Sequence, residues 1–173
     1  MNPTTTDRLV TATLDSPIGP LLAGATDEGI CLLEFAEPAR QQAQLAAVRR
    51  NFGDAVEPGR NEHTDRLAEE LADYFAGARQ DFTVPVVFSG TPFQRRVWKQ
   101  LRAIPYGETC SYEDVARAVG DARAVRAVGG ANGKNRVAIV VPCHRVINKG
   151  GRLGGYGGGL WRKQFLLDLE RRA

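Results

Sequence analysis

A cysteine followed directly by a histidine, Cys143-His144, is the pair in this 173-residue chain best suited to chemistry. A thiol becomes a strong nucleophile only as the thiolate, and imidazole is the side chain that accepts a proton most readily near neutral pH. A third polar group that orients the imidazole would complete a nucleophilic site, and Glu170 is the candidate. Because neighbouring side chains on an extended segment point in opposite directions, we expect a bridging water to carry the proton from sulfur to imidazole.

Taken alone, the pair also fits a buried structural cysteine, which is the more common role. Cys31, in a short apolar run, has no such neighbour and is predicted to lie in the hydrophobic core. Three cysteines, an odd number, exclude a disulfide framework and favour the reducing cytoplasm. With two histidines in the whole chain, the ligand spacings of a zinc site are missing, so no metal is expected.

The segments around the pair predict the elements that position it. Val137–Val141 is apolar and too short for a helix, which favours a buried strand-like segment. A glycine-rich loop, Gly150–Gly159, surrounds Tyr156 and leads into a last helix, Leu160–Arg172, which carries Glu170. The apolar residues predicted to pack this helix are Leu160, Phe165, Leu166 and Leu169.

Further upstream, capping signals predict three helices. Thr91-Pro92-Phe93-Gln94 opens the first, whose apolar face contains Phe93, Val97, Trp98 and Leu101. Ser111, with Asp114 three residues on, caps a short second helix that Gly120 ends. Asp121 is predicted to cap the third helix, Ala122–Asn132.

The second and third of these helices are joined by a tight turn, a pattern that predicts a helix-turn-helix. The third is rich in alanine and glycine and carries Arg123 and Arg126. Small residues would let this helix approach a nucleic-acid groove closely while arginine reaches in. The same pattern also fits a helical hairpin that binds nothing.

Charge divides the chain in two. Residues 1–88 hold seven Lys and Arg against fourteen Asp and Glu, whereas residues 89–173 hold sixteen against six. A half this basic is typical of a nucleic-acid-binding surface, because lysine and arginine displace counterions from phosphate. A solvated basic face without a partner explains the charge equally well.

The acidic half, residues 1–88, is predicted to be an α/β domain. It contains no group of residues suited to catalysis, so its expected role is that of a scaffold. Its expected elements are an antiparallel meander of Arg8–Leu14, Leu21–Ala25 and Ile30–Ala36, helices Pro38–Arg50 and Glu62–Ala78, and an extended Asp81–Phe88. No apolar run approaches the ~18 residues that span a bilayer, and no signal peptide is recognised, so no membrane is expected.

The string Pro142-Cys143-His144-Arg145-Val146-Ile147 resembles the active-site motif of the O6-alkylguanine-DNA alkyltransferases, or methylated-DNA–protein-cysteine methyltransferases. Other matching segments occur in the same order, and the similarity covers about residues 91–170. They are Ser111-Tyr112, Arg126-Ala127-Val128-Gly129-Gly130-Ala131, Asn135, Tyr156-Gly157-Gly158, and Leu166-Leu167 followed by Glu170. The implied fold has two domains: residues 1–88, ribonuclease-H-like, and residues 89–173, mainly helical with a helix-turn-helix.

The resemblance implies direct-reversal DNA repair, in which an alkyl group such as methyl moves from O6 of guanine to Cys143. O4 of thymine is a further candidate substrate. His144 and Glu170 would deprotonate the sulfur through water, and Asn135 would hold the adjoining turn and assist the sulfur. Tyr112 would rotate the phosphate backbone and donate its hydroxyl to guanine N3, where negative charge develops.

The same resemblance implies how duplex DNA would be held. The helix-turn-helix would enter the minor groove, with Arg126 filling the gap left by a flipped nucleotide and with Ala127 and Gly129 on the DNA-facing helix. The backbone carbonyls of Cys143 and Val146 would accept from the exocyclic amine of guanine. The pocket wall would be Tyr156 and Gly157.

The product is a thioether, which does not leave as a thiolester does, so each molecule would react once and need no cofactor. The expected protein is a cytoplasmic monomer whose partner is duplex DNA containing O6-alkylguanine. Gly157 stands where some relatives carry serine, so a backbone N–H is expected to replace that hydroxyl. Zinc ligands and a cysteine-rich regulatory domain, found in some relatives, are missing from this sequence. The preferred adduct, cooperative assembly on DNA and any further role of the first domain are left open.

Three other functions fit parts of the pattern. An alkyltransferase-like binding module would recognise alkylated DNA without repairing it, but such relatives lack the motif cysteine. A helix-turn-helix regulator would not need Tyr112, Cys143, His144 and Glu170 at these spacings. A cysteine hydrolase would need an oxyanion hole and would turn over repeatedly.

Overall fold

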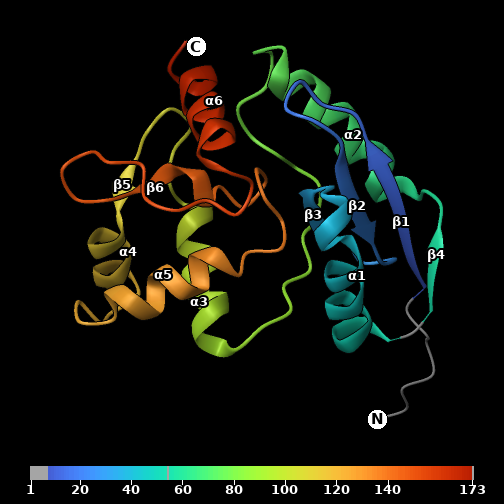
Figure 1. The fold of residues 1–173 in the computed structure, drawn as a ribbon, viewed down its shortest axis with the longest axis horizontal. Helices are drawn as coiled ribbons and strands as arrows, with labels where there is room; N and C mark the ends of the chain where they lie inside the picture. The colour runs from blue at the N-terminus through green and yellow to red at the C-terminus, as the bar shows by residue number, and fades with distance from the viewer. Residues whose placement is uncertain (1–7, 54, 173) are drawn as a thin grey trace. The chain divides into compact units, whose positions relative to one another are not determined.

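The computed structural model describes residues 8–53 and 55–172, and the chain divides between Ser89 and Gly90 into two compact units (Figure 1). Within these described residues, no helix is both long enough and apolar enough to cross a membrane. Each unit has its own buried core.

The first unit contains a four-stranded sheet in the order β3-β2-β1-β4. The strands are β1 (Leu9–Leu14), β2 (Leu21–Ala25), β3 (Ile30–Phe35) and β4 (Val56–Pro58). The pairs β1–β2 and β2–β3 are antiparallel, which confirms the predicted meander, whereas β4 runs parallel to β1. The sequence did not predict β4, because three residues ending in proline are too few to show an alternating pattern.

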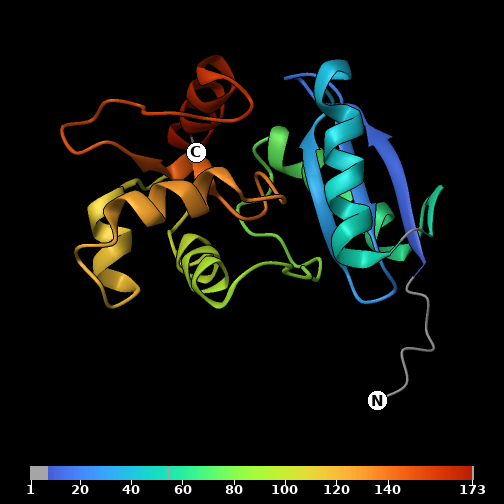
Figure 2. The same cartoon turned by 60° about the horizontal axis from the view of Figure 1, so that its bottom comes forward.

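Two helices pack on this sheet. They are α1 (Pro38–Phe52) and α2 (Glu62–Phe75), close to the ranges predicted. Figure 2 shows α1 lying across one face of the sheet, where Val48 joins a buried cluster that includes Leu22 and Cys31. Burial raises the pKa of the Cys31 thiol to about 12, so this cysteine is an inert core residue, as predicted.

A buried carboxylate joins α2 to the extended segment that follows it. Glu70 accepts hydrogen bonds from the backbone N–H groups of Thr83 and Val84, at 2.9 and 2.8 Å, and from the Thr83 hydroxyl at 2.9 Å. Arg79 forms an ion pair with the same carboxylate at 3.1 Å. Two residues further on, Val86 bridges Ile30 of β3, so Glu70 helps attach this segment to the sheet.

We expect Glu70→Gln to lower the free energy of unfolding by about 2 kcal/mol, because an amide N–H₂ would face backbone donors and Arg79 would lose its ion pair with the buried carboxylate. Urea unfolding followed by circular dichroism measures this loss. Glu69→Gln, an exposed change on the same helix, is the control and should leave stability unchanged. Equal stability of the two variants would show that the buried carboxylate contributes nothing.

The second unit is mainly helical, as predicted (Figure 1). Its helices are α3 (Pro92–Arg102), α4 (Tyr112–Ala118), α5 (Val125–Gly133) and α6 (Leu160–Arg171), with a short 3₁₀ helix, η1 (Cys143–Arg145). A two-residue parallel ladder joins β5 (Cys110–Ser111) to β6 (Val146–Ile147), and no pattern of two residues could have predicted it.

The predicted caps of α3 and α4 are confirmed. Thr91 and Gln94 form a capping box at α3, and Ser111 and Asp114 form one at α4. On the buried face of α3, the Trp98 indole donates to the Ala131 carbonyl at 2.9 Å and so ties α3 to α5. Trp98 is therefore a core residue, as predicted.

The predicted start of the third helix was wrong. The helix α5 begins at Val125, and Asp121 does not cap it. Instead, the Asp121 carboxylate accepts from Arg123 N–H and its carbonyl from Ala124 N–H, both at 3.0 Å. These bonds hold a turn, which is the alternative to helix capping that aspartate offers locally.

The prediction of a buried strand-like segment over Val137–Val141 was right about burial and wrong about the backbone. The segment is buried but forms a tight turn, in which Val141 N–H donates to the Val137 carbonyl at 3.0 Å. Ile139 has φ 70°, a left-handed conformation that β-branched residues rarely adopt. Short apolar runs report burial rather than backbone conformation, so the sequence could not reveal this turn.

The buried face of α6 differs from the predicted one. Leu160 and Phe165 were expected to pack, but they are 51% and 36% exposed. The buried residues are Lys163, Leu166, Leu167 and Glu170, which follow helical spacing. Two charged residues belong to this face, so an apolar stripe alone gave the wrong rotation of the helix.

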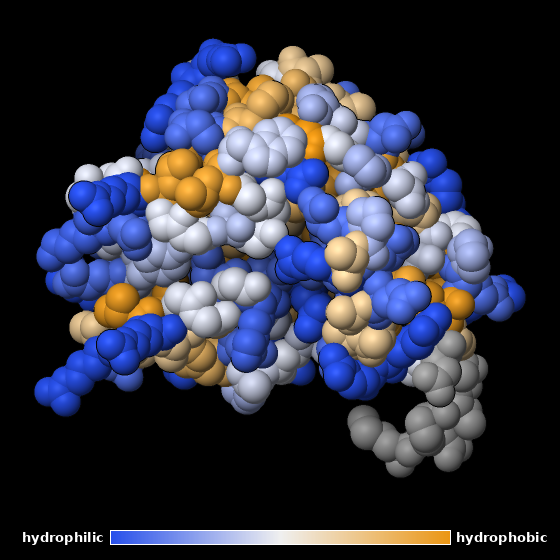
Figure 3. Space-filling model, in the orientation of Figure 1, coloured by the Kyte–Doolittle hydropathy of each residue, from blue (hydrophilic) through white to orange (hydrophobic). Residues whose placement is uncertain are grey.

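On the face drawn in Figure 3, apolar residues form separate patches among hydrophilic ones.

Candidate active site

The segment before Cys143 is held by one side-chain amide. Asn135 Nδ2 donates to the Val141 carbonyl at 2.8 Å, and Asn135 Oδ1 accepts from Val137 N–H at 3.0 Å. Cys143 N–H donates to the same Val141 carbonyl at 2.8 Å. Asn135 therefore joins both ends of the turn and sets the position of the cysteine that follows.

Cys143 is only 6% exposed. Burial raises the pKa of its thiol above the usual 9.0, although a hydrogen bond with Asn135 and the positive charge of Lys163 lower it. The resting protein thus holds Cys143 as a neutral thiol. A nucleophilic reaction at this sulfur requires a base that takes its proton.

His144 meets that requirement. Its Nε2 lies 2.7 Å from Glu170 Oε2, and both side chains are buried. Burial lowers the pKa of His144 below 6.5, against the opposing effect of Glu170. A neutral imidazole that donates its Nε2 proton to Glu170 leaves Nδ1 as an acceptor. That buried Nδ1 has no hydrogen-bond partner within the described part of the chain.

The pair lies on η1 rather than on an extended segment, so the expected opposite orientation of the two side chains does not apply. The described contacts include no hydrogen bond between the Cys143 sulfur and the His144 ring. Glu170, 26 residues away in sequence, is nevertheless brought to the imidazole by α6.

The sequence did not single out Arg145, which also binds Glu170. Its Nε and a terminal nitrogen donate to the two carboxylate oxygens at 2.8 and 3.1 Å, and its other terminal nitrogen donates to the Ile104 carbonyl at 2.7 Å. Gly107 N–H adds a longer bond of 3.4 Å to Glu170. A buried carboxylate needs hydrogen-bond donors, so the prediction of Glu170 as a site residue could have pointed to a cation such as Arg145 as its partner.

Lys163 is a second residue that sequence reasoning missed. It is fully buried, and its Nζ donates to the carbonyls of Val146 at 2.7 Å, Gly155 at 3.3 Å and Leu153. Burial lowers the pKa of Lys163, and the nearby Cys143 raises it. Lys163 thus ties β6 to the glycine-rich loop and places a positive charge near the sulfur.

Two tyrosines lie within electrostatic range of Cys143. Tyr112, the first residue of α4, and Tyr156, in the glycine-rich loop, both have a pKa raised first by burial and next by Cys143. The Tyr112 hydroxyl lies close to Gly154, where an added Cβ would come within 3.3 Å of it. Gly157 is exposed, with open space where a side chain would be.

The residues expected on the DNA side lie on α5, apart from this buried group. Arg126 and Ala127 are exposed, and Arg126 makes no hydrogen bond or ion pair with a described residue. A Cβ added at Gly129 would meet nothing within 4 Å. The helix therefore presents an open surface of small residues with one exposed arginine.

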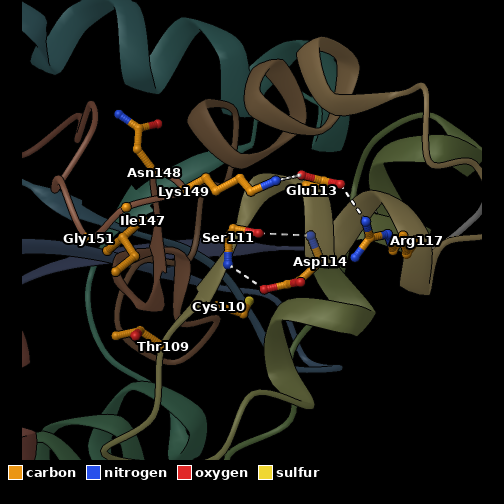
Figure 4. A pocket seen from close by; sticks show the side chains of 11 residues that line it. Thr109, Cys110, Ser111, Glu113, Asp114, Arg117, Ile147, Asn148, Lys149 and Gly151 are labelled. Atoms are coloured by element: carbon orange, nitrogen blue, oxygen red, sulfur yellow. Dashed lines mark hydrogen bonds and ion pairs between the residues drawn. The ribbon is translucent and has the colours of Figure 1, made fainter.

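A hollow of about 330 Å³ lies between the start of α4 and residues 147–151 (Figure 4). Glu113 on its rim pairs with Arg117 and, at 3.3 Å, with Lys149. Burial and the nearby Asp114 raise the pKa of Cys110 to about 11, so this thiol is unreactive. None of the predicted site residues lines the hollow.

Sequence and structure comparisons place this geometry in a family. Residues 9–88 match the model of the "6-O-methylguanine DNA methyltransferase, ribonuclease-like domain", and residues 92–172 match that of the DNA binding domain. A methylated-DNA–protein-cysteine methyltransferase of Mycolicibacterium paratuberculosis is 46% identical over 162 residues, covering 92% of this chain and 91% of the relative. The chain belongs to the 6-O-methylguanine DNA methyltransferase family.

Solved structures agree with this membership. The O6-methylguanine methyltransferase of Mycobacterium tuberculosis is 42% identical with a TM-score of 0.79, covering 95% of this chain and 93% of that one. A structure of Mycobacterium tuberculosis OGT in complex with DNA gives a TM-score of 0.81 at 42% identity, over 94% and 93% of the two chains. In this methyltransferase, Cys143, His144 and Glu170 all lie in the region that matches the family's DNA binding domain.

We expect Lys163→Met to raise the pKa of Cys143, because a positive charge that favours the thiolate is lost. Iodoacetamide labelling of Cys143, followed by peptide mass against pH, gives the midpoint of thiolate formation. A rise of one unit in the pKa of Cys143 lowers its thiolate fraction about tenfold at a pH below the midpoint. Lys99→Met, an exposed change on α3, is the control. A midpoint unchanged by Lys163→Met would contradict an electrostatic effect on the sulfur.

Proposed function

We propose that this methyltransferase repairs O6-alkylguanine in duplex DNA by transferring the alkyl group to its own Cys143. The observation that carries the proposal is the buried arrangement of Cys143, His144 and Glu170, with His144 Nδ1 left as an acceptor. The Mycolicibacterium paratuberculosis relative is named for this transfer, and the Mycobacterium tuberculosis OGT forms a complex with DNA. Duplex DNA is accordingly the partner.

The reaction follows from the neutral state of the thiol. His144 Nδ1 takes the Cys143 proton through a bridging water, and Glu170 stabilises the imidazolium that forms. The thiolate attacks the alkyl carbon in line with the carbon–oxygen bond, which breaks and leaves its electron pair on the guanine. The proton held by His144 then passes to the guanine. The net change converts thiol and O6-alkylguanine to thioether and guanine, and the stable thioether ends the reaction after one turnover.

Several groups would hold the guanine. Tyr112 donates its hydroxyl to N3 as charge develops on the leaving base. The carbonyls of Cys143 and Val146 accept from the exocyclic amine. Each already accepts one bond, from Val146 N–H and from Lys163 Nζ, and a carbonyl has a second lone pair. Tyr156 and Gly157 form the wall of the pocket, and Asn135 holds the turn beneath the sulfur.

The burial of Cys143 explains why the base must leave the stack, because a thiol that is 6% exposed cannot reach O6 inside a duplex. The two helices α4 and α5 form a helix-turn-helix that enters the minor groove. Arg126 fills the gap left by the flipped nucleotide. Ala127 and Gly129 allow close approach of α5 to the DNA.

Residues 1–88 form the support domain, and residues 89–173 form the domain that binds DNA and transfers the alkyl group. The sheet order β3-β2-β1-β4, antiparallel except for the β1–β4 pair, supports a ribonuclease-H-like topology for the first. The protein acts as a monomer in the cytoplasm without a cofactor. O4-alkylthymine is a second candidate substrate.

The transfer itself is tested by intact mass after incubation with a duplex that contains one O6-methylguanine. We expect one methylene mass to be gained and to map to Cys143, and Cys143→Ala to gain none while still binding DNA. Cys110→Ser is the matched control and should gain the same mass as the wild type. Binding without any mass change in the wild type would instead indicate a protein that only recognises alkylated DNA.

The role of Arg126 is tested by comparing duplex DNA with the free base O6-methylguanine. Arg126→Ala should slow methyl transfer from the duplex by at least about tenfold, because the flipped state loses its filler, while reaction with the free base stays unchanged. Arg123→Ala, which removes an exposed arginine from the preceding turn, is the control. Equal losses on both substrates would contradict the assignment.

A further inference from the structure

The imidazole of His144 depends on a residue that makes no contact with the reacting sulfur. Arg145 is 6% exposed, and it spans both oxygens of Glu170 at 2.8 and 3.1 Å. Its guanidinium is also held by the Ile104 carbonyl at 2.7 Å and lies 5.7 Å from the centre of the Tyr106 ring. A buried guanidinium with this many partners has one orientation, and it imposes one orientation on Glu170.

Charge balance gives Arg145 a second effect. In a buried group the net-neutral arrangement costs least, because an uncompensated charge loses its hydration. Within the hydrogen-bonded group of Arg145, Glu170 and His144, which Lys163 does not join, the neutral arrangement is the one in which His144 is unprotonated. Without the arginine charge, the neutral arrangement would be an imidazolium paired with Glu170, and an imidazolium cannot accept the cysteine proton.

We propose that Arg145 is a positioning residue that aims Glu170 at His144 and whose positive charge keeps His144 unprotonated, and so able to act as the base. This inference rests on the proposed function, because it concerns the base that prepares Cys143 for alkyl transfer.

Other charged and titratable groups also surround His144. Glu170 raises the pKa of His144, whereas Arg145 and Lys163 lower it in addition to burial. Cys143 precedes His144 on η1, Tyr106 faces the guanidinium, and Tyr156 lies within range of both Glu170 and Cys143. Of the two cations, only Arg145 binds the carboxylate that orients the imidazole.

The test is the rate of methyl transfer against pH for three variants. Loss of the charge in Arg145→Gln should move the acid-side midpoint upward by about one pH unit. Arg145→Lys keeps the charge but not the two-pronged contact, so its midpoint should stay while its plateau rate falls several-fold. In Arg145→Gln/Glu170→Gln both charges are gone, so the neutral imidazole is again favoured and the midpoint should return downward. A purely structural role of Arg145 predicts lower rates in all three variants without these different shifts of the midpoint.

A second measurement requires neither DNA nor transfer. The chain has two histidines, so NMR titration in a Cys143→Ser background follows His144 with His63 as an internal reference. The His144 midpoint should rise in Arg145→Gln, stay in Arg145→Lys and fall in the double variant, with His63 unchanged. Arg172→Gln, an exposed change at the end of α6, controls for net charge.

The outcomes separate the two proposals. Absence of transfer by the wild type would overturn the proposed function, whatever the titrations show. Transfer by the wild type with identical midpoints in Arg145→Gln and Arg145→Lys would overturn the role of Arg145. If Arg145→Gln does not fold, Arg145→Lys and the charge-balanced double variant still decide. An upward midpoint shift in Arg145→Lys, or a midpoint in the double variant that lies above that of the wild type, would refute the proposal.

Discussion

The buried carboxylate of Glu170 is the interaction on which the second unit depends. Its oxygens form hydrogen bonds with the His144 ring, with two nitrogens of Arg145 and with Gly107 N–H. These bonds join α6 to η1 and to the turn after α3. A carboxylate placed this deep is tolerable only when its oxygens are bonded and its charge is compensated. The same bonds that make it tolerable give His144 its orientation, so folding and chemistry share one set of contacts.

The sulfur is prepared by opposing effects. Burial keeps Cys143 protonated, while the Asn135 contact and the Lys163 charge favour the thiolate without producing it at rest. A neutral buried thiol is protected from the side reactions that a permanent thiolate would invite. Under the proposed function, in which Cys143 reacts once, activation only when a base and a substrate are both in place is a physical advantage.

Much of this could be predicted from local signals. Thr91 and Ser111 marked helix starts because side-chain caps are local, and the three antiparallel strands were visible because short turns separate them. The helix start predicted at Asp121 was wrong for the same reason, because an aspartate that holds a turn and one that caps a helix give the same local sequence pattern. Ile139 and Asn135 form a buried turn whose shape depends on one side-chain amide, which no periodicity reports.

The sequence by itself determined the chemical types: a thiol next to an imidazole, a carboxylate near the end of the chain, and an arginine on a helix of small residues. Those follow from residue identity and from a motif of contiguous residues. The tertiary structure alone decided that Glu170 meets His144, that Arg145 shares the carboxylate, and that Lys163 is buried with its charge acting on Cys143. Such contacts join residues far apart in the chain, and their energy comes from desolvation and charge pairing, which exist only once the chain has folded.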